Sequence, residues 1–499
     1  MTETIAVIAI YFGFLIVFGF ISSRKIKSAS DFIVAGRSIG FFGFALLMMG
    51  STASGGTTLG VPSLGFTGGW PTFWEQFFLP LSCCVCLMFF GVKLNRVAIK
   101  RNYLTVEDYF CERYYSERSM RLLSPIFAVV VSLIYLMAQY RSIGIVLQEL
   151  LNINYLTALI ISAIIITIYV LLGGLHAISF ITLFHVLLII VGVVVATPFI
   201  IAKIPDFNRV LGEIDSNMLQ PYYPQKYPPY EKYAFFTPFY ILSFFLFLTF
   251  GIASAPHVIN NVLTVKERNY FKWSPLFVFI IFFVAMSLFK IDGFAARALN
   301  ETGKINVEQS DFAFIATIKF VFPQFLWVFM GVVILAAVVS TTDRLMLTVG
   351  NCISWGIYKR YINKNAEDKT ITLINRLTIV IGTIIAVLMV IKPPQLLIFL
   401  IWTSIGIMFS SFTIPLVGGL YWRRATKEAG IIAMSLGFVS AMVFAYIHYF
   451  ITPLPLHFSF FACLISAVTF VVISLITSAP PKEVLENTET GFYIWGPKE

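Results

Sequence analysis

Hydrophobic residues are gathered in long runs along this chain of 499 residues, and short polar segments separate the runs. A helix needs about 20 consecutive apolar residues to cross the hydrocarbon core of a bilayer. The runs of that length lie near residues 4–22, 39–66, 72–94, 122–147, 154–173, 180–202, 235–262, 273–294, 323–349, 371–391, 394–421, 428–450 and 456–477. This pattern predicts an all-α integral membrane protein with about 13 transmembrane helices.

Lys and Arg residues gather in five of the connections between these runs. The basic connections are 23–38, 95–121, 263–272, 350–370 and 422–427, whereas 67–71, 148–153 and 451–455 contain no Lys or Arg. Short cytoplasmic loops of membrane proteins carry an excess of Lys and Arg. The alternation therefore predicts a multi-pass protein of the cell membrane with its N-terminus outside and its C-terminus in the cytoplasm.

The composition argues against a soluble protein and against an enzyme. Hydrophobic residues make up 58% of the chain and charged residues 12%, whereas soluble chains are about 25% charged. The net charge of +10 comes mainly from the short loops, so we expect a lipid bilayer as partner and no nucleic acid. The five histidines are scattered, and no HExxH motif occurs. Nothing in the sequence indicates an obligatory protein partner.

Two of the long runs are interrupted by residues that disfavour a continuous helix. The first contains GSTASGGTTLGVPSLG at 50–65, and the second contains GIASAPHVINN at 251–261. Irregular backbone at membrane depth must be buried in protein or line a cavity. Paired interruptions, each opening a block of five spans, favour an inverted-repeat transporter with a site at the midplane. Tolerated kinks or close packing of small residues remain the alternative.

A third segment, ILAAVVSTTDRLML at 334–347, places several oxygen atoms on one helix face. Residues three and four apart share a face, so the Ala337 carbonyl and the Ser340 and Thr341 hydroxyls can converge. Uncharged oxygen ligands suit a weakly held Na⁺, and an unwound stretch at Gly50–Ala53 would supply further carbonyls. Alternatively, both hydroxyls bond to the preceding turn or to a neighbouring helix.

The chain resembles the sodium:solute symporter family from about residue 2 to 478. The motifs that carry the resemblance are GRSIG (36–40), LLGGLHAISF (171–180), GIASAPHVINN, and ILAAVVSTTDRLML followed by IYKR (357–360). The resemblance implies a five-plus-five inverted-repeat, leucine-transporter-like core with discontinuous helices. The implied divisions are 1–38 (extra span and inner loop), 39–427 (core, with repeats 39–202 and 235–427), 428–477 (two further spans) and 478–499 (cytoplasmic tail).

The resemblance also implies Na⁺ as the coupling ion. The family's sodium site corresponds to the backbone oxygens of Gly50, Ala53 and Ala337 and the hydroxyls of Ser340 and Thr341. Thr52 and Thr182 stand where some members carry acidic residues, so we expect one sodium ion per cycle. A sodium-independent carrier of the same fold is the alternative.

Charged residues inside spans are candidates for contact with the solute. Arg141 would anchor a carboxylate, because a guanidinium binds carboxylates with two parallel hydrogen bonds. Glu75 lies in a neighbouring span, and it would contact the solute or pair with Arg141. A further alternative is that Arg141 extends to the membrane interface.

The remaining candidates are aromatic, hydroxyl and charged residues near the interruptions. Further solute-binding candidates are Trp74, Tyr240, Trp402 and Thr403. Asp343 and Arg344 would form an inner gate, or a plain salt bridge at a helix end. Together these residues predict sodium-coupled symport of a small carboxylate-bearing solute (an amino acid, pantothenate or a monocarboxylate) by alternating access. A sugar is the alternative solute.

Overall fold

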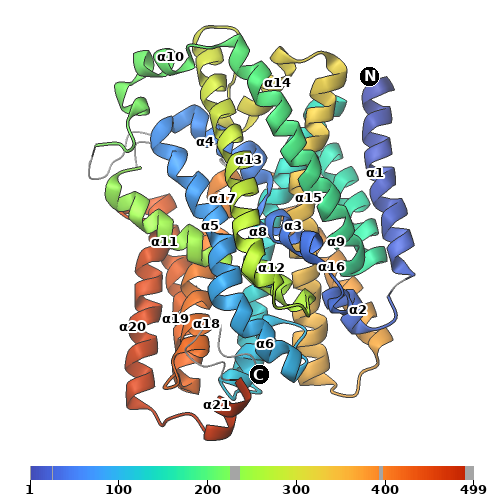
Figure 1. Cartoon of the computed structure of the whole chain (residues 1–499), viewed down its shortest axis with the longest axis vertical. Coiled ribbons are helices and arrows are strands. Elements are labelled where there is room, and N and C mark those ends of the chain that lie inside the picture. The colour runs from blue at the N-terminus through green and yellow to red at the C-terminus, as the bar shows by residue number, and fades with distance from the viewer. Residues whose placement is uncertain (1, 25, 225–235, 393–396, 489–499) are drawn as a thin grey trace.

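The computed structural model describes residues 2–24, 26–224, 236–392 and 397–488, and within them every regular element is helical. The helices form one elongated bundle (Figure 1). Helix α1 (Thr2–Ser23) begins at the same end of the bundle as α10 (Phe207–Ile214), on the other side of it, and α21 (Lys482–Thr488) lies at the opposite end beside α6 (Val92–Arg101). We call these the α10 end and the α6 end. The prediction of an all-α membrane fold is confirmed.

The predicted apolar runs correspond to helices throughout the described part of the chain. The other helices that form the bundle are α3 (Phe41–Thr52), α4 (Val61–Gly68), α5 (Glu75–Val85), α8 (Ser119–Leu151), α9 (Tyr155–Lys203), α11 (Pro238–Ser254), α12 (Pro256–Ile259), α13 (Tyr270–Glu301), α14 (Ala313–Val321), α15 (Gln324–Asn351), α16 (Asp368–Met389), α17 (Leu397–Met408), α18 (Ile414–Tyr421), α19 (Lys427–Tyr446) and α20 (Phe458–Ile476). Residues 235 and 394–396 of the predicted spans, and 489–499 of the predicted tail, lie outside the described residues.

The number of spans depends on how α9 is divided. Among the described residues, ten helices are long and apolar enough to cross a membrane, or up to twelve with two bent pairs. Helix α9 contains two of the predicted runs, 154–173 and 180–202, which meet at Gly174. Gly174 has φ +47° and ψ −150°, a conformation that no helical residue adopts. A Cβ there would lie 2.6 Å from the Phe32 ring, so glycine is required at this junction.

Both predicted interruptions are present, and side chains bind backbone N–H groups at the first of them. Helix α3 ends at Thr52, Ala53 is extended, and the chain resumes as a π-helical turn (Gly56–Gly60) that continues into α4. The Gln139 side chain accepts a hydrogen bond from the Gly55 N–H at 3.1 Å, and Ser54 Oγ accepts one from the Gly56 N–H at 3.1 Å. Such partners allow irregular backbone at membrane depth.

The second break, between α11 and α12, bends the chain by 51°. Ala255 is extended, and Pro256 begins the next helix. Proline has no N–H to continue the α11 ladder, but it fits the first turn of a helix.

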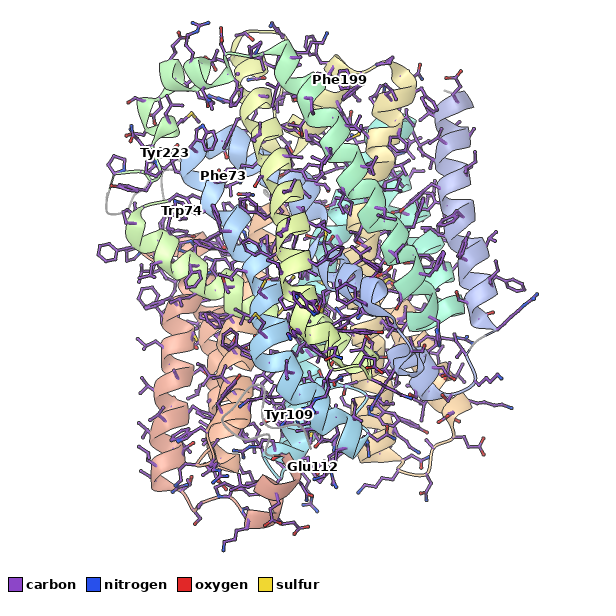
Figure 2. All side chains as sticks on the ribbon, in the orientation of Figure 1. Phe73, Trp74, Tyr109, Glu112, Phe199 and Tyr223 are labelled. Carbon is purple, nitrogen blue, oxygen red and sulfur yellow. The ribbon has the colours of Figure 1, made fainter. Side chains whose placement is uncertain are left out.

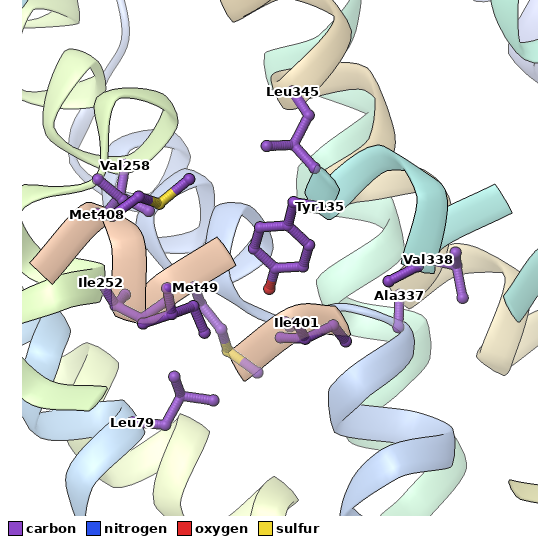
Figure 3. Packing of buried hydrophobic residues seen from close by; sticks show 14 of the residues in the cluster. Met49, Leu79, Tyr135, Ile252, Val258, Ala337, Val338, Leu345, Ile401 and Met408 are labelled. Atoms are coloured by element: carbon purple, nitrogen blue, oxygen red, sulfur yellow. The ribbon is translucent and has the colours of Figure 1, made fainter. Parts of the chain in front are cut away.

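The core of the bundle surrounds α15, whose residues from Gly331 to Asn351 are all buried. Figure 3 shows part of this core, with Met49, Tyr135, Ala337 and Ile401 among the packed side chains. Large apolar side chains on the outer helices are exposed instead, for example Leu388 of α16 and Ile476 of α20. An apolar outer surface of this extent is what a surrounding bilayer requires.

Candidate functional site

The five oxygen atoms predicted to hold sodium lie together at the break of α3. The Thr341 hydroxyl donates to the Ala53 carbonyl oxygen at 2.7 Å and lies 3.2 Å from that of Gly50. The Ser340 hydroxyl lies 2.9 Å from the Ala337 carbonyl oxygen and 3.4 Å from that of Ala53. All five residues are buried. The alternative to a sodium site was that these hydroxyls bond to the preceding helical turn. The Ser340 hydroxyl does make such a bond, to the Ala337 carbonyl.

Thr182, in the part of α9 that follows Gly174, packs against Gly50 beside these oxygen atoms. Its Cγ2 would lie 2.2 Å from a Cβ added to Gly50, so the two helices approach each other here as closely as glycine allows. The Thr182 hydroxyl is fully buried and has no hydrogen-bond partner among the described residues. It therefore adds an uncharged oxygen, rather than a carboxylate, beside the five.

A small cavity of about 20 Å³ lies next to this cluster. Its polar lining consists of Thr52, Ser54, Thr57, Glu75, Tyr135 and Trp402, and apolar residues such as Leu79, Leu248 and Ile401 complete the wall. About 10–15 Å³ suffices for one water molecule. An organic solute could therefore enter only if the surrounding helices moved apart.

Glu75 forms a buried ion pair with Lys290 of α13, at 3.3 Å between Oε2 and Nζ. Both side chains are almost completely shielded, and the Trp402 indole lies beside the carboxyl group. The suggested pair between Glu75 and Arg141 is therefore wrong. Lys290 was missed because a single lysine in an apolar run does not reveal its partner 215 residues away.

Arg141 is instead paired with Asp311, at 3.0 Å, and both side chains are buried. Asp311 also accepts a hydrogen bond from the Leu397 N–H at 3.3 Å, and its other oxygen lies 3.4 Å from the Ser63 hydroxyl. One carboxylate thus joins α8, α17 and α4. The role of Arg141 as a carboxylate anchor stays a prediction, but its guanidinium already has an internal partner and does not line the cavity.

Three other solute-binding candidates lie away from the cavity. Trp74 donates its indole hydrogen to the Pro221 carbonyl at 2.7 Å, and Figure 2 shows it near Phe73 and Tyr223, toward the α10 end. Tyr240 packs on Phe244, and the Thr403 hydroxyl bonds to the Phe399 carbonyl at 2.6 Å. Of the predicted solute-binding residues, Glu75 and Trp402 line the cavity.

The gate candidates Asp343 and Arg344 do not form the salt bridge that the sequence suggested. The Asp343 carboxylate accepts a short hydrogen bond from the Tyr169 hydroxyl. The Arg344 side chain has no hydrogen bond or ion pair with any described residue, although it is 4% exposed. Both residues lie within α15 rather than at its end. Consecutive residues of an α-helix point in directions about 100° apart, so the two side chains do not face each other.

Comparison with known proteins adds to this geometry. The sequence model of the sodium:solute symporter family matches residues 32–437. The chain belongs to this family. It is 22% identical over 497 residues to the osmoregulated proline transporter OpuE of Bacillus subtilis (strain 168), with 96% of each chain covered. It is 23% identical over 459 residues to the sodium/proline symporter of Salmonella typhimurium, covering 89% of this chain and 88% of that one.

Solved structures of low sequence identity share the fold. An outward-open, substrate-bound Na⁺-coupled sialic acid symporter superimposes with a TM-score of 0.77 at 15% identity, covering 96% of this chain and 98% of that one. Mhp1, a nucleobase-cation-symport-1 family transporter in a closed conformation, gives a TM-score of 0.52 at 13% identity, covering 93% and 99%. This member of the sodium:solute symporter family is thus a multi-pass membrane protein and a sodium-coupled symporter, with Na⁺ as its coupling ion.

Proposed function

We propose that Na⁺ binds among the oxygens of Gly50, Ala53, Ala337, Ser340 and Thr341. The observation that carries this proposal is the approach of the Thr341 hydroxyl to the Ala53 carbonyl, 2.7 Å across the break of α3. Two hydroxyls and three carbonyls offer hard, neutral oxygens. The Ala53 N–H still donates to the Met49 carbonyl of α3, whereas the Ala53 carbonyl accepts from the Thr341 hydroxyl. One such cluster supports one sodium ion per cycle.

We further propose that the solute is a small amino acid or similar carboxylate bound in the adjacent cavity. Gly56 and Thr57, at the start of the helical leg 56–68, line this cavity. The N-terminus of a helix carries partial positive charge and attracts a carboxylate. Glu75 lines the cavity, and its carboxylate would bind an ammonium group in competition with Lys290. Leu79, Leu248 and Ile401 suit an apolar side chain. Relatives named as proline transporters make L-proline the first solute to test.

The proposed cycle is alternating access, with the α10 end outside and the α6 end in the cytoplasm. Basic residues such as Lys100 and Arg101 at the α6 end favour this orientation. The Arg141–Asp311 pair ties α8, α17 and α4 together between the cavity and the α10 end. We propose that this contact forms when the outer path closes. Na⁺ drives the cycle only if its affinity differs between the outward-open and inward-open states.

Uptake by proteoliposomes tests this proposal. We expect L-proline to accumulate when the external solution contains Na⁺ and not when K⁺ replaces it. Equal uptake in both salts would favour a sodium-independent carrier. Sodium-driven uptake of glucose but not of L-proline, pantothenate or lactate would favour the sugar alternative. The double variant Glu75→Gln, Lys290→Met, which removes both charges of the buried pair, should abolish proline uptake and leave Na⁺ binding intact, because neither residue is among the sodium oxygens.

A further inference from the structure

A second polar site lies between the sodium oxygens and the α6 end of the bundle. Ser340, Thr341 and Arg344 lie three, four and seven positions after Ala337, so the four residues share one face of α15. Helix α15 leads into the turn that contains Trp355, which bonds to Asp108 of α7 (Val106–Arg113). Arg344 therefore lies one turn closer to the α6 end than the sodium cluster.

Arg344 is a buried cation whose donors are unused. It is 4% exposed, and its side chain makes no hydrogen bond or ion pair with any residue in the described ranges. The nearest acid in sequence, Asp343, accepts a hydrogen bond from Tyr169, and it attracts Arg344 electrostatically without forming an ion pair with it. An unpaired charge is costly in a protein interior, so buried arginines normally have an anionic partner. Arg141 and Arg121, which are buried as well, both have one.

Two polar side chains that follow the α11 break also have atoms without hydrogen-bond partners in the part of the chain that the structure describes. His257 of α12 is 1% exposed, and α12 packs against α15, the helix that carries Arg344. Neither of its ring nitrogens has a hydrogen-bond partner. The Asn261 side chain donates to the Ser51 hydroxyl at 2.8 Å, but its oxygen has no partner. The unused donors on Arg344 and His257 match an anion.

This site is separated from the central cavity by one aromatic ring. Tyr135 lines the cavity, and its hydroxyl donates to Ser54 at 3.3 Å. The same ring packs edge-on against His257, with 5.6 Å between ring centroids. A movement of Tyr135 would therefore connect the cavity to His257 and Arg344.

We propose that Arg344 and His257 form an anion site that receives the solute carboxylate on its way from the central cavity to the cytoplasm. The guanidinium provides a two-pronged donor for the carboxylate, and the imidazole N–H provides a third hydrogen bond. This proposal rests on the proposed function, because it assumes a carboxylate-bearing solute. The site lies beyond the sodium cluster, so the carboxylate would meet Arg344 only after leaving its first position.

Acetate, the smallest carboxylate of this kind, provides the test. Thermal unfolding of the purified full chain is followed while sodium acetate replaces sodium methanesulfonate at constant Na⁺. A ligand that binds only the folded state stabilises it by RT ln(1 + [L]/Kd), so the unfolding temperature rises with ligand concentration according to the affinity. We expect Arg344→Gln to weaken the apparent acetate affinity at least tenfold and His257→Gln to weaken it less. Arg344→Lys keeps the positive charge but loses the two parallel N–H donors of the guanidinium, so its acetate affinity should lie between those of the wild type and Arg344→Gln.

Two control variants show whether the Arg344 guanidinium itself binds acetate. Arg360→Gln removes a positive charge farther along toward the α6 end and should leave acetate affinity unchanged. Asp343→Asn should also leave it unchanged, and an equal loss there would mean that Arg344 acts through Asp343. Unchanged acetate affinity in both Arg344 variants would overturn the anion site. Competition by chloride as strong as that by acetate would overturn its role for the solute.

The same preparations distinguish failure of this site from failure of the sodium proposal. Arg344→Gln should still be stabilised by Na⁺ relative to K⁺, because its side chain is not among the sodium oxygens. If the wild type shows no preference for Na⁺, the sodium site is wrong, whatever acetate does. If Na⁺ stabilises both proteins and acetate binds both equally, only the anion site is wrong.

Discussion

The Thr341 hydroxyl of α15 donates a hydrogen bond of 2.7 Å to the carbonyl oxygen of Ala53, in the break of α3. These residues are 288 positions apart in the chain, and they belong to the two halves of the predicted inverted repeat. The contact joins an intact helix to an interrupted one, at the place where the buried carbonyl oxygens of Gly50 and Ala53 contact a side-chain hydroxyl. A cation bound here would therefore change how the two helices sit against each other, which is what coupling requires.

The contact between Gly50 and Thr182 should set the distance from α3 to α9. A Cβ at position 50 would lie 2.2 Å from Thr182 Cγ2, so Gly50→Ala should destabilise the fold by about 1–3 kcal/mol and weaken Na⁺ binding. Adding Thr182→Ser removes that methyl group and leaves Val186 Cγ2 as the next neighbour, at 3.3 Å. We expect the double variant to regain most of the lost unfolding temperature. If the double variant does not regain it, a contact other than the Thr182 methyl group limits how closely α3 approaches α9.

The Glu75–Lys290 pair should be costly to break from one side. Lys290→Met would leave a buried carboxylate without its cation, and the expected loss of stability is about 3–5 kcal/mol. The double variant Glu75→Gln, Lys290→Met removes both charges and should unfold at nearly the wild-type temperature, although it should not transport. Thermal unfolding of the three purified proteins measures this. If Lys290→Met alone unfolds at the wild-type temperature, the ion pair makes no net contribution to the stability of the fold.

The Arg141–Asp311 contact should hold the path from the α10 end closed. In a chain carrying Thr57→Cys, we expect Asp311→Asn to increase cavity labelling by a charged thiol reagent about tenfold, a change of about 1.4 kcal/mol. The parent chain without Thr57→Cys corrects for the six native cysteines.

The exposed pair Arg209–Glu213 on α10 provides a matched control for that experiment. Its side chains are 66% and 61% exposed, and ion pairs in water contribute little. Glu213→Gln should therefore leave the labelling rate unchanged. If both variants accelerate labelling equally, the Arg141–Asp311 pair does not hold a gate.

The spans and the sodium cluster could be predicted because their signals are local or repeated. Apolar length identifies spans, and the spacing of Ala337, Ser340 and Thr341 places their oxygens on one helix face. The Gly and Pro content of residues 50–65 identifies the opposing break. The sequence did not show that α9 continues from one predicted span into the next, because the change of direction depends on φ at Gly174.

The partners of buried charges could not be predicted in the same way. Lys290 and Asp311 lie 215 and 170 residues from Glu75 and Arg141, so only the fold reveals the pairing. The lysine had a visible signal, since a charge within an apolar span is rare. Asp311 lies in a connection between spans, where acidic residues are common, and nothing local distinguishes it.

The most direct test of the sodium site compares Na⁺ with K⁺ in thermal unfolding of the wild type, Thr341→Ser and Thr341→Ala. We expect Na⁺ to stabilise the wild type and Thr341→Ser, because both keep a hydroxyl group at position 341. Thr341→Ala should bind Na⁺ at least about tenfold more weakly, a loss of about 1.4 kcal/mol. Equal stabilisation of all three proteins by Na⁺, or no difference between Na⁺ and K⁺ in the wild type, would contradict the proposed site.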